Sequence, residues 1–259
     1  MRRFEDKVVV VTGAAQGIGF AIARRFGREG AQVVIPDINE KGAVEAAQTL
    51  EKEDIKAVGL YCDVASKKSV DAAFAEAEKR FKTCHVLVNN AGAASETLLL
   101  DMTEEEWHHA IGVILNGTFF CTQAAARLMR KTGVAGAIVN IASQGWRTSK
   151  PGRNHYSAGK AAVVQFTRSS AIDLAPYNIR VNAISPGGVA TGMSTYLLDD
   201  PAKMARYTSH VPLARLGSVD EIASVAAFLA SDDASFMTAA NLDVDGGKNA
   251  LGSSLRIGA

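Results

Sequence analysis

Tyr156 and Lys160 lie four residues apart in the stretch HYSAGK, residues 155–160. On an α-helix this spacing places both side chains on one face. A nearby positive charge favours the phenolate form of a tyrosine, so Tyr156 could exchange a proton near neutral pH. The pair could also be two amphipathic side chains on a solvated helix, because the spacing alone often occurs by chance. The rest of the sequence has to separate these two readings.

A second candidate site is the glycine-rich stretch TGAAQGIG, residues 12–19. Gly13 permits a tight turn, Gly17 lets the backbone approach a diphosphate, and Gly19 permits close packing of a helix on a strand. The following helix would direct its free N–H groups and its partial positive charge at the phosphates. A structural glycine turn is the alternative. Because a predicted strand precedes the stretch and a predicted helix follows it, we interpret it as a nucleotide-binding turn.

Asp37 ends the second predicted strand, close to the spacing of about 20 residues that this motif requires. A carboxylate there can accept hydrogen bonds from the adenine-ribose hydroxyls and would repel the extra phosphate of NADP. Gln16 is neutral and Ile38 is apolar, so neither supplies a cation for that phosphate. The sequence therefore predicts NAD as the cofactor. A turn or helix-capping role is the alternative for Asp37.

Apolar, β-rich runs alternate with helical stretches along the chain. Strands are predicted at residues 7–12, 31–37, 56–62, 85–92, 136–143, 179–187 and 240–247. Their continuous apolar character is typical of a parallel sheet that is covered on both faces. We therefore predict an α/β fold, a single doubly wound Rossmann-type domain over residues 1–259 with a seven-stranded parallel sheet and helices on both faces. The segment 188–217 is expected to be irregular and to cover the substrate.

Helical periodicity and capping residues mark the segments between the strands. Ile18, Ile22 and Phe26 share one face of the first predicted helix. The capping signals are Ser66, Ser218, and a capping box formed by Thr103 and Glu106. Further helices are predicted at about 39–53, 66–81, 116–131, 155–175 and 218–231.

Composition excludes several classes of protein. The 259 residues include 28 basic and 27 acidic ones, for a net charge of +1, so no field attracts nucleic acid or an anionic membrane. No segment approaches about 18 uninterrupted apolar residues, and the N-terminus lacks the pattern of a signal peptide. The three cysteines and five histidines form no metal-binding motif. We expect reduced, buried thiols, no metal, a cytoplasmic location and a small-molecule substrate.

With these residues in view, the chain resembles the short-chain dehydrogenase/reductase family over roughly residues 5–248. TGAAQGIG fits the family's TGxxxGxG turn, and Ser143, Tyr156 and Lys160 fit its serine–tyrosine–lysine set. The other matching elements are NNAG at 89–92, ILNGTF with Asn116, SPGGVAT at 185–191, and DVDGG at 243–247.

The resemblance implies a role for each residue. Tyr156 would be the general acid/base, Ser143 would hydrogen-bond the substrate oxygen, and Lys160 would lower the pKa of Tyr156 and bind the nicotinamide ribose. Asn116 would hold a water in a proton relay beyond Lys160. The cofactor would contact Gly13, Gln16, Gly17, Ile18, Gly19, Asp37, Ile38, Asp63, Val64, Asn90, Ala91, Gly92, Tyr156, Lys160, Pro186, Gly187, Val189 and Thr191.

The resemblance also implies a homotetramer with D₂ symmetry, because relatives are commonly tetramers. Small or polar positions on the helix that follows Tyr156 would let helices approach each other closely, and the tail after Gly247 would join an interface. These positions are Ala158, Ala161, Ala162 and Gln165.

The substrate is left open. Trp146 and Arg147 either narrow the pocket or fold away from it, and Gly188 leaves space. Arg147, Lys150 and Arg153 either favour an anionic or hydroxyl-rich substrate or belong to a solvated loop. Three functions compete: NAD-dependent oxidation of a polyol, sugar or hydroxy acid, reduction of a 3-oxoacyl thioester, and non-catalytic NAD sensing.

Overall fold

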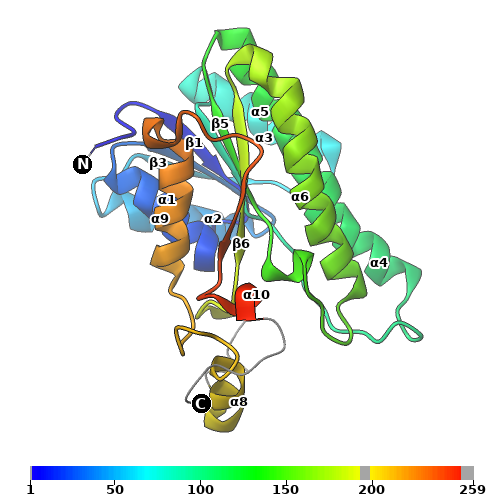
Figure 1. Ribbon diagram of the computed structural model, residues 1–259. Helices are drawn as coiled ribbons and strands as arrows, with labels where there is room; N and C mark the ends of the chain where they lie inside the picture. Colours follow the sequence, from blue (N-terminus) through cyan, green and yellow to red (C-terminus); the bar gives the residue numbers. More distant parts are fainter. Residues whose placement is uncertain (1, 193–198, 252–259) are drawn as a thin grey trace.

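A computed structural model describes residues 2–192 and 199–251 of the chain. Seven parallel strands form one sheet in the order β3-β2-β1-β4-β5-β6-β7. The strands are β1 (Val8–Val11), β2 (Gln32–Asp37), β3 (Ala57–Tyr61), β4 (Val86–Asn89), β5 (Ala137–Ile141), β6 (Arg180–Pro186) and β7 (Asn241–Val244). Helices cover both faces of this sheet (Figure 1). The predicted doubly wound α/β fold is confirmed.

The helices form two layers, one on each face of the sheet (Figure 1). One layer contains α1 (Gly17–Arg28), α2 (Glu40–Glu51) and α9 (Val219–Ala230). The other contains α3 (Lys67–Phe81), α5 (Gly117–Thr132) and α6 (Asn154–Leu174). Helix α4 (Glu104–Ile111) packs beside α6 and leads through a π-helical turn, η1 (Gly112–Asn116), into α5.

Strand β1 shows why its sequence needs a helix on both sides. It consists of four valines, all of them buried. Successive side chains of a strand point to opposite faces of the sheet. Val9 and Val11 pack with Ile22 and other residues of the α1 layer, whereas Val8 and Val10 pack in the core of the α3 layer. An uninterrupted apolar run is therefore the expected sequence of this strand.

The capping predictions are confirmed. The Thr103 hydroxyl accepts a hydrogen bond from the Glu106 N–H, and the Glu106 carboxylate accepts one from the Thr103 N–H. The Ser66 and Ser218 hydroxyls cap α3 and α9 in the same way, by accepting bonds from backbone N–H groups. These caps satisfy N–H groups that a helix cannot satisfy itself.

The expectation that residues 188–217 are irregular is wrong in part, because the segment contains helix α8 (Pro201–Thr208). The Asp200 carboxylate accepts hydrogen bonds from the N–H groups of Ala202 and Lys203, and Pro201 occupies the start of the helix. Proline is favoured there because its ring fixes a helical φ and that N–H has no helical partner. Residues 193–198 lie outside the described part of the chain.

The chain continues after β7 into the short helix α10 (Lys248–Leu251), and residues 252–259 lie outside the described part. Within residues 2–192 and 199–251, no helix has both the length and the apolar character that a membrane span requires. The same residues bring together no group of three or more potential metal ligands among His, Cys, Asp and Glu.

The expectation of buried, reduced thiols is confirmed, since Cys62, Cys84 and Cys121 are free and buried. Burial raises the pKa of Cys62 to about 11 and that of Cys84 to about 12. Both side chains are therefore neutral thiols at physiological pH, and they act as small apolar residues of the core.

Candidate active site

The predicted site residues gather at the carboxyl edge of the sheet. The glycine-rich turn follows β1, Asp37 ends β2, and Ser143 follows β5. The sheet reverses its winding direction beside β1, which has β2 on one side and β4 on the other. Open α/β sheets bind ligands in the crevice outside the carboxyl ends at such a switch point.

The three glycines of the turn each meet a different requirement. Gly13 has a φ of +64°, and a Cβ atom there would lie 2.8 Å from Cα of Ala91. A Cβ on Gly19 would lie 2.5 Å from the side chain of Asn90. Gly17 also has a positive φ, of +61°, but a Cβ there would meet no atom within 4 Å. Gly13 and Gly19 are thus needed for packing, whereas Gly17 faces open space.

The start of α1 fits a phosphate group. Gln16 is the N-cap residue and makes no side-chain capping bond, and the first turn contains no acidic residue. The first backbone N–H groups of a helix lack helical partners and carry a partial positive charge. Together with the open space at Gly17, this leaves a cradle suited to the diphosphate of a dinucleotide.

Thr12 joins this turn to the NNAG segment, a role that the sequence analysis missed. Its hydroxyl accepts hydrogen bonds from the N–H groups of Asn90 (3.0 Å) and Ala91 (3.1 Å). The Asn90 amide donates in return to the carbonyls of Thr12 (3.0 Å) and Gly13 (2.9 Å). A polar residue at the end of a buried apolar strand was the available signal.

Asp37 lies directly against the glycine-rich turn. Its carboxylate accepts hydrogen bonds from the N–H groups of Ala15 (3.0 Å) and Asn39 (2.9 Å). The turn role considered as an alternative is therefore real, but a carboxylate has further acceptor sites for ribose hydroxyls. The neighbouring side chains of Gln16 and Ile38 are exposed.

Most of the remaining predicted cofactor residues follow β3, β4 and β6 at the same edge of the sheet, and Ile18 lies in α1. The Asp63 carboxylate accepts a bond from the Ala65 N–H, and Val64 is buried against Gly117. A Cβ on Gly187 would lie 2.7 Å from Cα of Asp245, so this position requires glycine. The others are Ile18 in α1, Gly92 after β4, Pro186 at the end of β6, and Val189 and Thr191 in the following loop.

Ser143, Tyr156 and Lys160 come together as the sequence predicted. The Ser143 hydroxyl lies beside the Tyr156 phenol and acts to lower the pKa of that phenol, and it accepts a bond from the Gly145 N–H (3.1 Å). The buried Lys160 ammonium donates to the carbonyl of Ile141 (2.7 Å) and lies 5.9 Å from the centroid of the Tyr156 ring. The phenol, the hydroxyl and the ammonium therefore form one polar group between η2 (Gln144–Trp146) and α6.

The electrostatics of this group differ from the expectation. Burial raises the pKa of Tyr156, while the Ser143 hydroxyl and the charge of Arg153 act against that rise. Burial lowers the pKa of Lys160 to about 8. The Arg153 guanidinium lies 5.5 Å from the Tyr156 ring centroid and is held by Glu96 at 2.8 Å. Arg153 is thus a second cationic side chain beside the phenol. The sequence predicted this role for Lys160 and for no other side chain.

The role of Asn116 in a proton relay stays a prediction. Asn116 is exposed at the end of η1. Ile114, two residues earlier, is buried in a cluster against which Tyr156 packs, and a Cβ on Gly159 would lie 3.0 Å from it. Ile114 and Asn116 therefore differ in burial, although they lie two residues apart in the same turn.

Trp146 and Arg147, whose positions relative to the pocket the sequence did not decide, lie in different places. Trp146 packs against the same cluster as Tyr156, and its indole N–H donates to the Asp243 carboxylate (3.2 Å). Arg147 is exposed and lies over the Trp146 ring at 5.0 Å. Trp146 therefore borders the site, whereas Arg147 lies on its outer side.

Comparison with known proteins gives a consistent family. A family model described as Enoyl-(Acyl carrier protein) reductase matches residues 13–249. L-rhamnose 1-dehydrogenase (NAD(P)(+)) of Azotobacter vinelandii is 42% identical over 246 residues, covering 93% of this chain and 96% of the relative. The 3-oxoacyl-[acyl-carrier-protein] reductase FabG of Chlamydia trachomatis is 38% identical over 243 residues, covering 93% and 97%.

The solved structures agree with the sequence matches. A short-chain type dehydrogenase/reductase from Mycobacterium marinum superposes with a TM-score of 0.90 at 32% identity, covering 95% of this chain and 96% of that one. The fold, the geometry of the motifs and the relatives all indicate the same family. The chain therefore belongs to the short-chain dehydrogenase/reductase family and is an oxidoreductase that acts on alcohol or ketone groups.

Proposed function

We propose that this enzyme oxidises a secondary alcohol of a polyol, sugar or hydroxy acid, with NAD as its cofactor. The observation that carries the proposal is the Asp37 carboxylate, fixed against the glycine-rich turn by the N–H groups of Ala15 and Asn39. A negative charge there favours free ribose hydroxyls over a ribose phosphate. The similarity to L-rhamnose 1-dehydrogenase supports a sugar-like substrate.

The cofactor would be held by groups that the fold already positions. The N-terminus of α1 and the open side of Gly17 would receive the diphosphate, and Asp37 would bind the adenine ribose. Lys160 would bind the nicotinamide ribose beside the phenol. When bound, the nicotinamide accepts the hydride; orientation and proton transfer are left to the protein.

Proton transfer falls to Tyr156 in this proposal. Its phenolate would take the proton of the substrate hydroxyl while the Ser143 hydroxyl hydrogen-bonds the same oxygen. Tyr156 is half-buried and Lys160 is buried, and the Lys160 ammonium lies 5.9 Å from the centroid of the Tyr156 ring. The charges of Lys160 and Arg153 favour the form in which the phenol has lost its proton.

Cofactor choice can be tested with Asp37→Ala combined with Ile38→Arg. The double substitution removes the charge that repels the NADP phosphate and supplies a cation at an exposed neighbouring position. We expect preference to shift toward NADP by about 1–3 kcal/mol, which is the usual worth of a hydrogen bond to a charged group. The measurement is kcat/KM for NAD and for NADP in the wild type and the variant.

A matched control is Asp71→Ala, which removes an exposed carboxylate on α3 that pairs with Lys67. In this control, the ratio of kcat/KM with NAD to kcat/KM with NADP should be unchanged. Wild-type turnover with NADP equal to or better than that with NAD would contradict the proposal.

Reduction of a 3-oxoacyl thioester is the second candidate, favoured by the similarity to FabG and by the description of the matching family model. That reaction normally uses NADPH, so the cofactor preference also separates the two candidates. A panel of secondary alcohols, ketones and 3-oxoacyl thioesters, scored with both cofactors, decides between them. NAD binding without turnover of any compound would instead favour a sensor.

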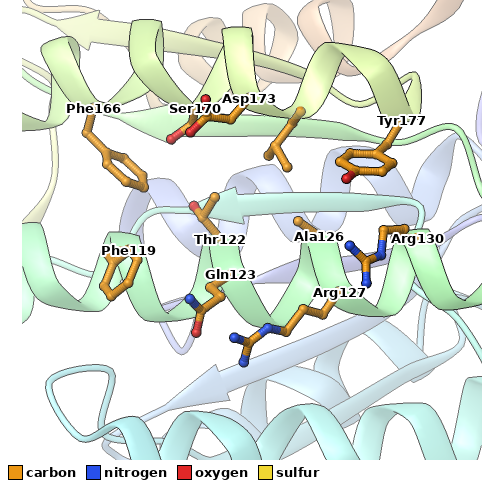
Figure 2. A pocket seen from close by; sticks show the side chains of 11 residues that line it. Phe119, Thr122, Gln123, Ala126, Arg127, Arg130, Phe166, Ser170, Asp173 and Tyr177 are labelled. Atoms are coloured by element: carbon orange, nitrogen blue, oxygen red, sulfur yellow. The ribbon is translucent and has the colours of Figure 1, made fainter.

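We also propose that the enzyme is a homotetramer. A groove of about 250 Å³ runs between α5 and α6 (Figure 2), and its lining includes the rings of Phe119, Phe166 and Tyr177. Phe119 and Tyr177 are exposed, and Ile172 on α6 is 73% exposed. Apolar side chains concentrated on neighbouring helices are suited to a second copy of the chain, and a D₂ assembly repeats such a two-fold contact.

Light scattering at micromolar concentration should give the mass of four chains of 27.3 kDa each. Phe119→Glu would place a charge in the groove and should lower this mass. Phe236→Glu is the control, since Phe236 is fully exposed after α9 and lines no part of the groove. A monomeric wild type would contradict the proposed assembly.

A cytoplasmic location completes the proposal. Its support is the three free, buried cysteines, a usage typical of proteins in a reducing compartment. Recovery of the enzyme outside the cytoplasmic fraction of its cell would contradict this assignment.

A further inference from the structure

Three segments that are distant in sequence meet beside Ser143. Gln144 follows Ser143 directly, and its amide nitrogen lies 3.5 Å from the Tyr207 hydroxyl on α8. Lys248, the first residue of α10, places its ammonium 3.7 Å from the centroid of the Tyr207 ring. Helices α8 and α10 lie at the same end of the molecule (Figure 1). The cluster of Gln144, Tyr207 and Lys248 thus adjoins the proposed reaction centre without belonging to the Ser143–Tyr156–Lys160 group.

Gly188 fixes the position of Tyr207 in this cluster. A Cβ on Gly188 would lie 2.4 Å from the Tyr207 hydroxyl oxygen and 2.6 Å from Cζ of the same ring. A side chain at Gly188 would therefore push Tyr207 away. The space that the sequence analysis noted at this glycine is filled by the phenol ring.

Gln144 has an unmet hydrogen-bonding requirement. Its side-chain oxygen is buried and accepts no hydrogen bond from any described residue. Buried polar atoms without a partner are uncommon in proteins, because they lose their hydrogen bonds to water. A hydroxyl donor supplied by a substrate would satisfy this oxygen.

Lys248 is the cation of this cluster. It is half-buried and forms no ion pair within residues 2–192 and 199–251. The nearest acidic residue in the chain, Asp245, uses its two oxygens to accept bonds from the N–H groups of Gly247 (2.9 Å) and Asn249 (2.7 Å). Burial lowers the pKa of Lys248, the charge of Asp245 raises it in part, and the charge of Lys150 lowers it again. A bound anion would favour the charged ammonium further.

We propose that Gln144, Tyr207 and Lys248 bind the part of the substrate remote from the reacting carbon, and that they select a polyhydroxy acid. The carboxylate would pair with the Lys248 ammonium over the Tyr207 ring, and a hydroxyl would donate to the Gln144 oxygen. This inference rests on the proposed oxidation of a secondary alcohol. It narrows the substrate from polyols, sugars and hydroxy acids to compounds that carry both hydroxyls and a carboxylate.

The test compares compounds that differ only in the end group. Gluconate and galactonate are matched against sorbitol and galactitol, which carry a CH₂OH group in place of the carboxylate. Binding of each compound to the NADH complex of the full-length enzyme is measured by calorimetry, and turnover is measured with NAD. The proteins are the wild type, Lys248→Gln, Lys248→Arg and, as a control, Lys203→Gln, an exposed lysine of α8 that pairs with Asp200.

We expect the wild type to prefer the acids and Lys248→Gln to reduce that preference by about 10- to 100-fold, the range for a hydrogen bond to a charged group. Lys248→Arg should retain most of the preference, and Lys203→Gln should retain all of it. Circular dichroism would show that each variant is folded.

Several results would overturn the inference. One is a preference for acids over polyols that Lys248→Gln leaves unchanged. Another is a Lys248→Gln enzyme that loses affinity for NADH but keeps the wild-type ratio of acid affinity to polyol affinity. Equal binding of acids and polyols by the wild type, or binding of neither, would also overturn it. Turnover of neutral alcohols would show in these cases that the proposed function stands. If no alcohol is oxidised with either cofactor, the proposed function fails. The affinities of the acids and the polyols, measured by calorimetry, then still show whether Lys248 binds a carboxylate.

Discussion

Replacing Tyr156 with phenylalanine is expected to lower alcohol oxidation by at least about 10²-fold, since general acid–base catalysis contributes about 10²–10⁴-fold. The variant loses the phenol that is proposed to accept the substrate proton and that lies beside Ser143. Its ring can still pack against the cluster that contains Ile114. Folding and NAD affinity should therefore survive.

The measurements are steady-state turnover, NAD affinity and thermal unfolding of the variant. Tyr177→Phe is a matched control, because Tyr177 lines the groove between α5 and α6, and none of the predicted site residues lines that groove. Retention of more than about a tenth of wild-type turnover would be far above what loss of the acid/base allows. In that case the assignment of Tyr156 is wrong.

Lys160→Ala should have a different signature, with loss of both turnover and NAD affinity. The substitution removes a cation beside Tyr156 and the group proposed to bind the nicotinamide ribose. It also leaves the buried Ile141 carbonyl without the donor that now lies 2.7 Å away. A buried acceptor without a partner costs about 1–3 kcal/mol, so the melting temperature should fall as well. We expect turnover to fall about 10²-fold or more, as for other proton-transfer residues.

The double variant of Tyr156 and Lys160 makes this test sharper. Both residues act on one proton transfer, so their effects on turnover should not add. Lys131→Ala, at an exposed lysine that pairs with Glu78, serves as the control for loss of charge. Unchanged NAD affinity in Lys160→Ala, or a double variant whose loss is the product of the single losses, would contradict the proposed role.

Local signals predicted the sheet, the caps and the cofactor turn. The strands could be predicted because each must be apolar on both faces, which leaves continuous runs such as the four valines of β1. The caps depend on side chains three residues apart, as for Thr103 and Glu106. Asp37 and the glycines lie at strand ends, where topology alone brings them to one edge.

Properties that depend on helix orientation and on burial could not be predicted. The π-helical turn η1 places Ile114 in the buried cluster against which Tyr156 packs and leaves Asn116 exposed. The pKa of Lys160 falls because α6 buries it, and burial is a property of the folded chain. Arg153 acts on Tyr156 because Glu96, from a distant loop, holds it in place.

Helix α8 and the contact between Tyr207 and Lys248 were not predicted from the sequence, for different reasons. Helix α8 could have been found from the pair Asp200–Pro201, a start signal that is readable in the sequence. The meeting of Tyr207 with Lys248 could not, because it depends on how two segments fold over the same edge of the sheet.

The pH dependence of hydride transfer in a single turnover, followed by NADH absorbance, tests the central claim most directly. Oxidation requires the deprotonated phenol, so its rate should rise with pH. Burial raises the pKa of Tyr156, whereas the positive charges of Arg153, Lys160 and a bound oxidised nicotinamide favour the phenolate. We therefore expect a rise of one proton's slope through a single apparent pKa below the ordinary tyrosine value of about 10, and a plateau above it. Tyr156→Phe should be slow at every pH and lack this rise. A wild-type rate independent of pH, or a Tyr156→Phe enzyme that follows the wild-type curve, would contradict the assignment of Tyr156 as the base.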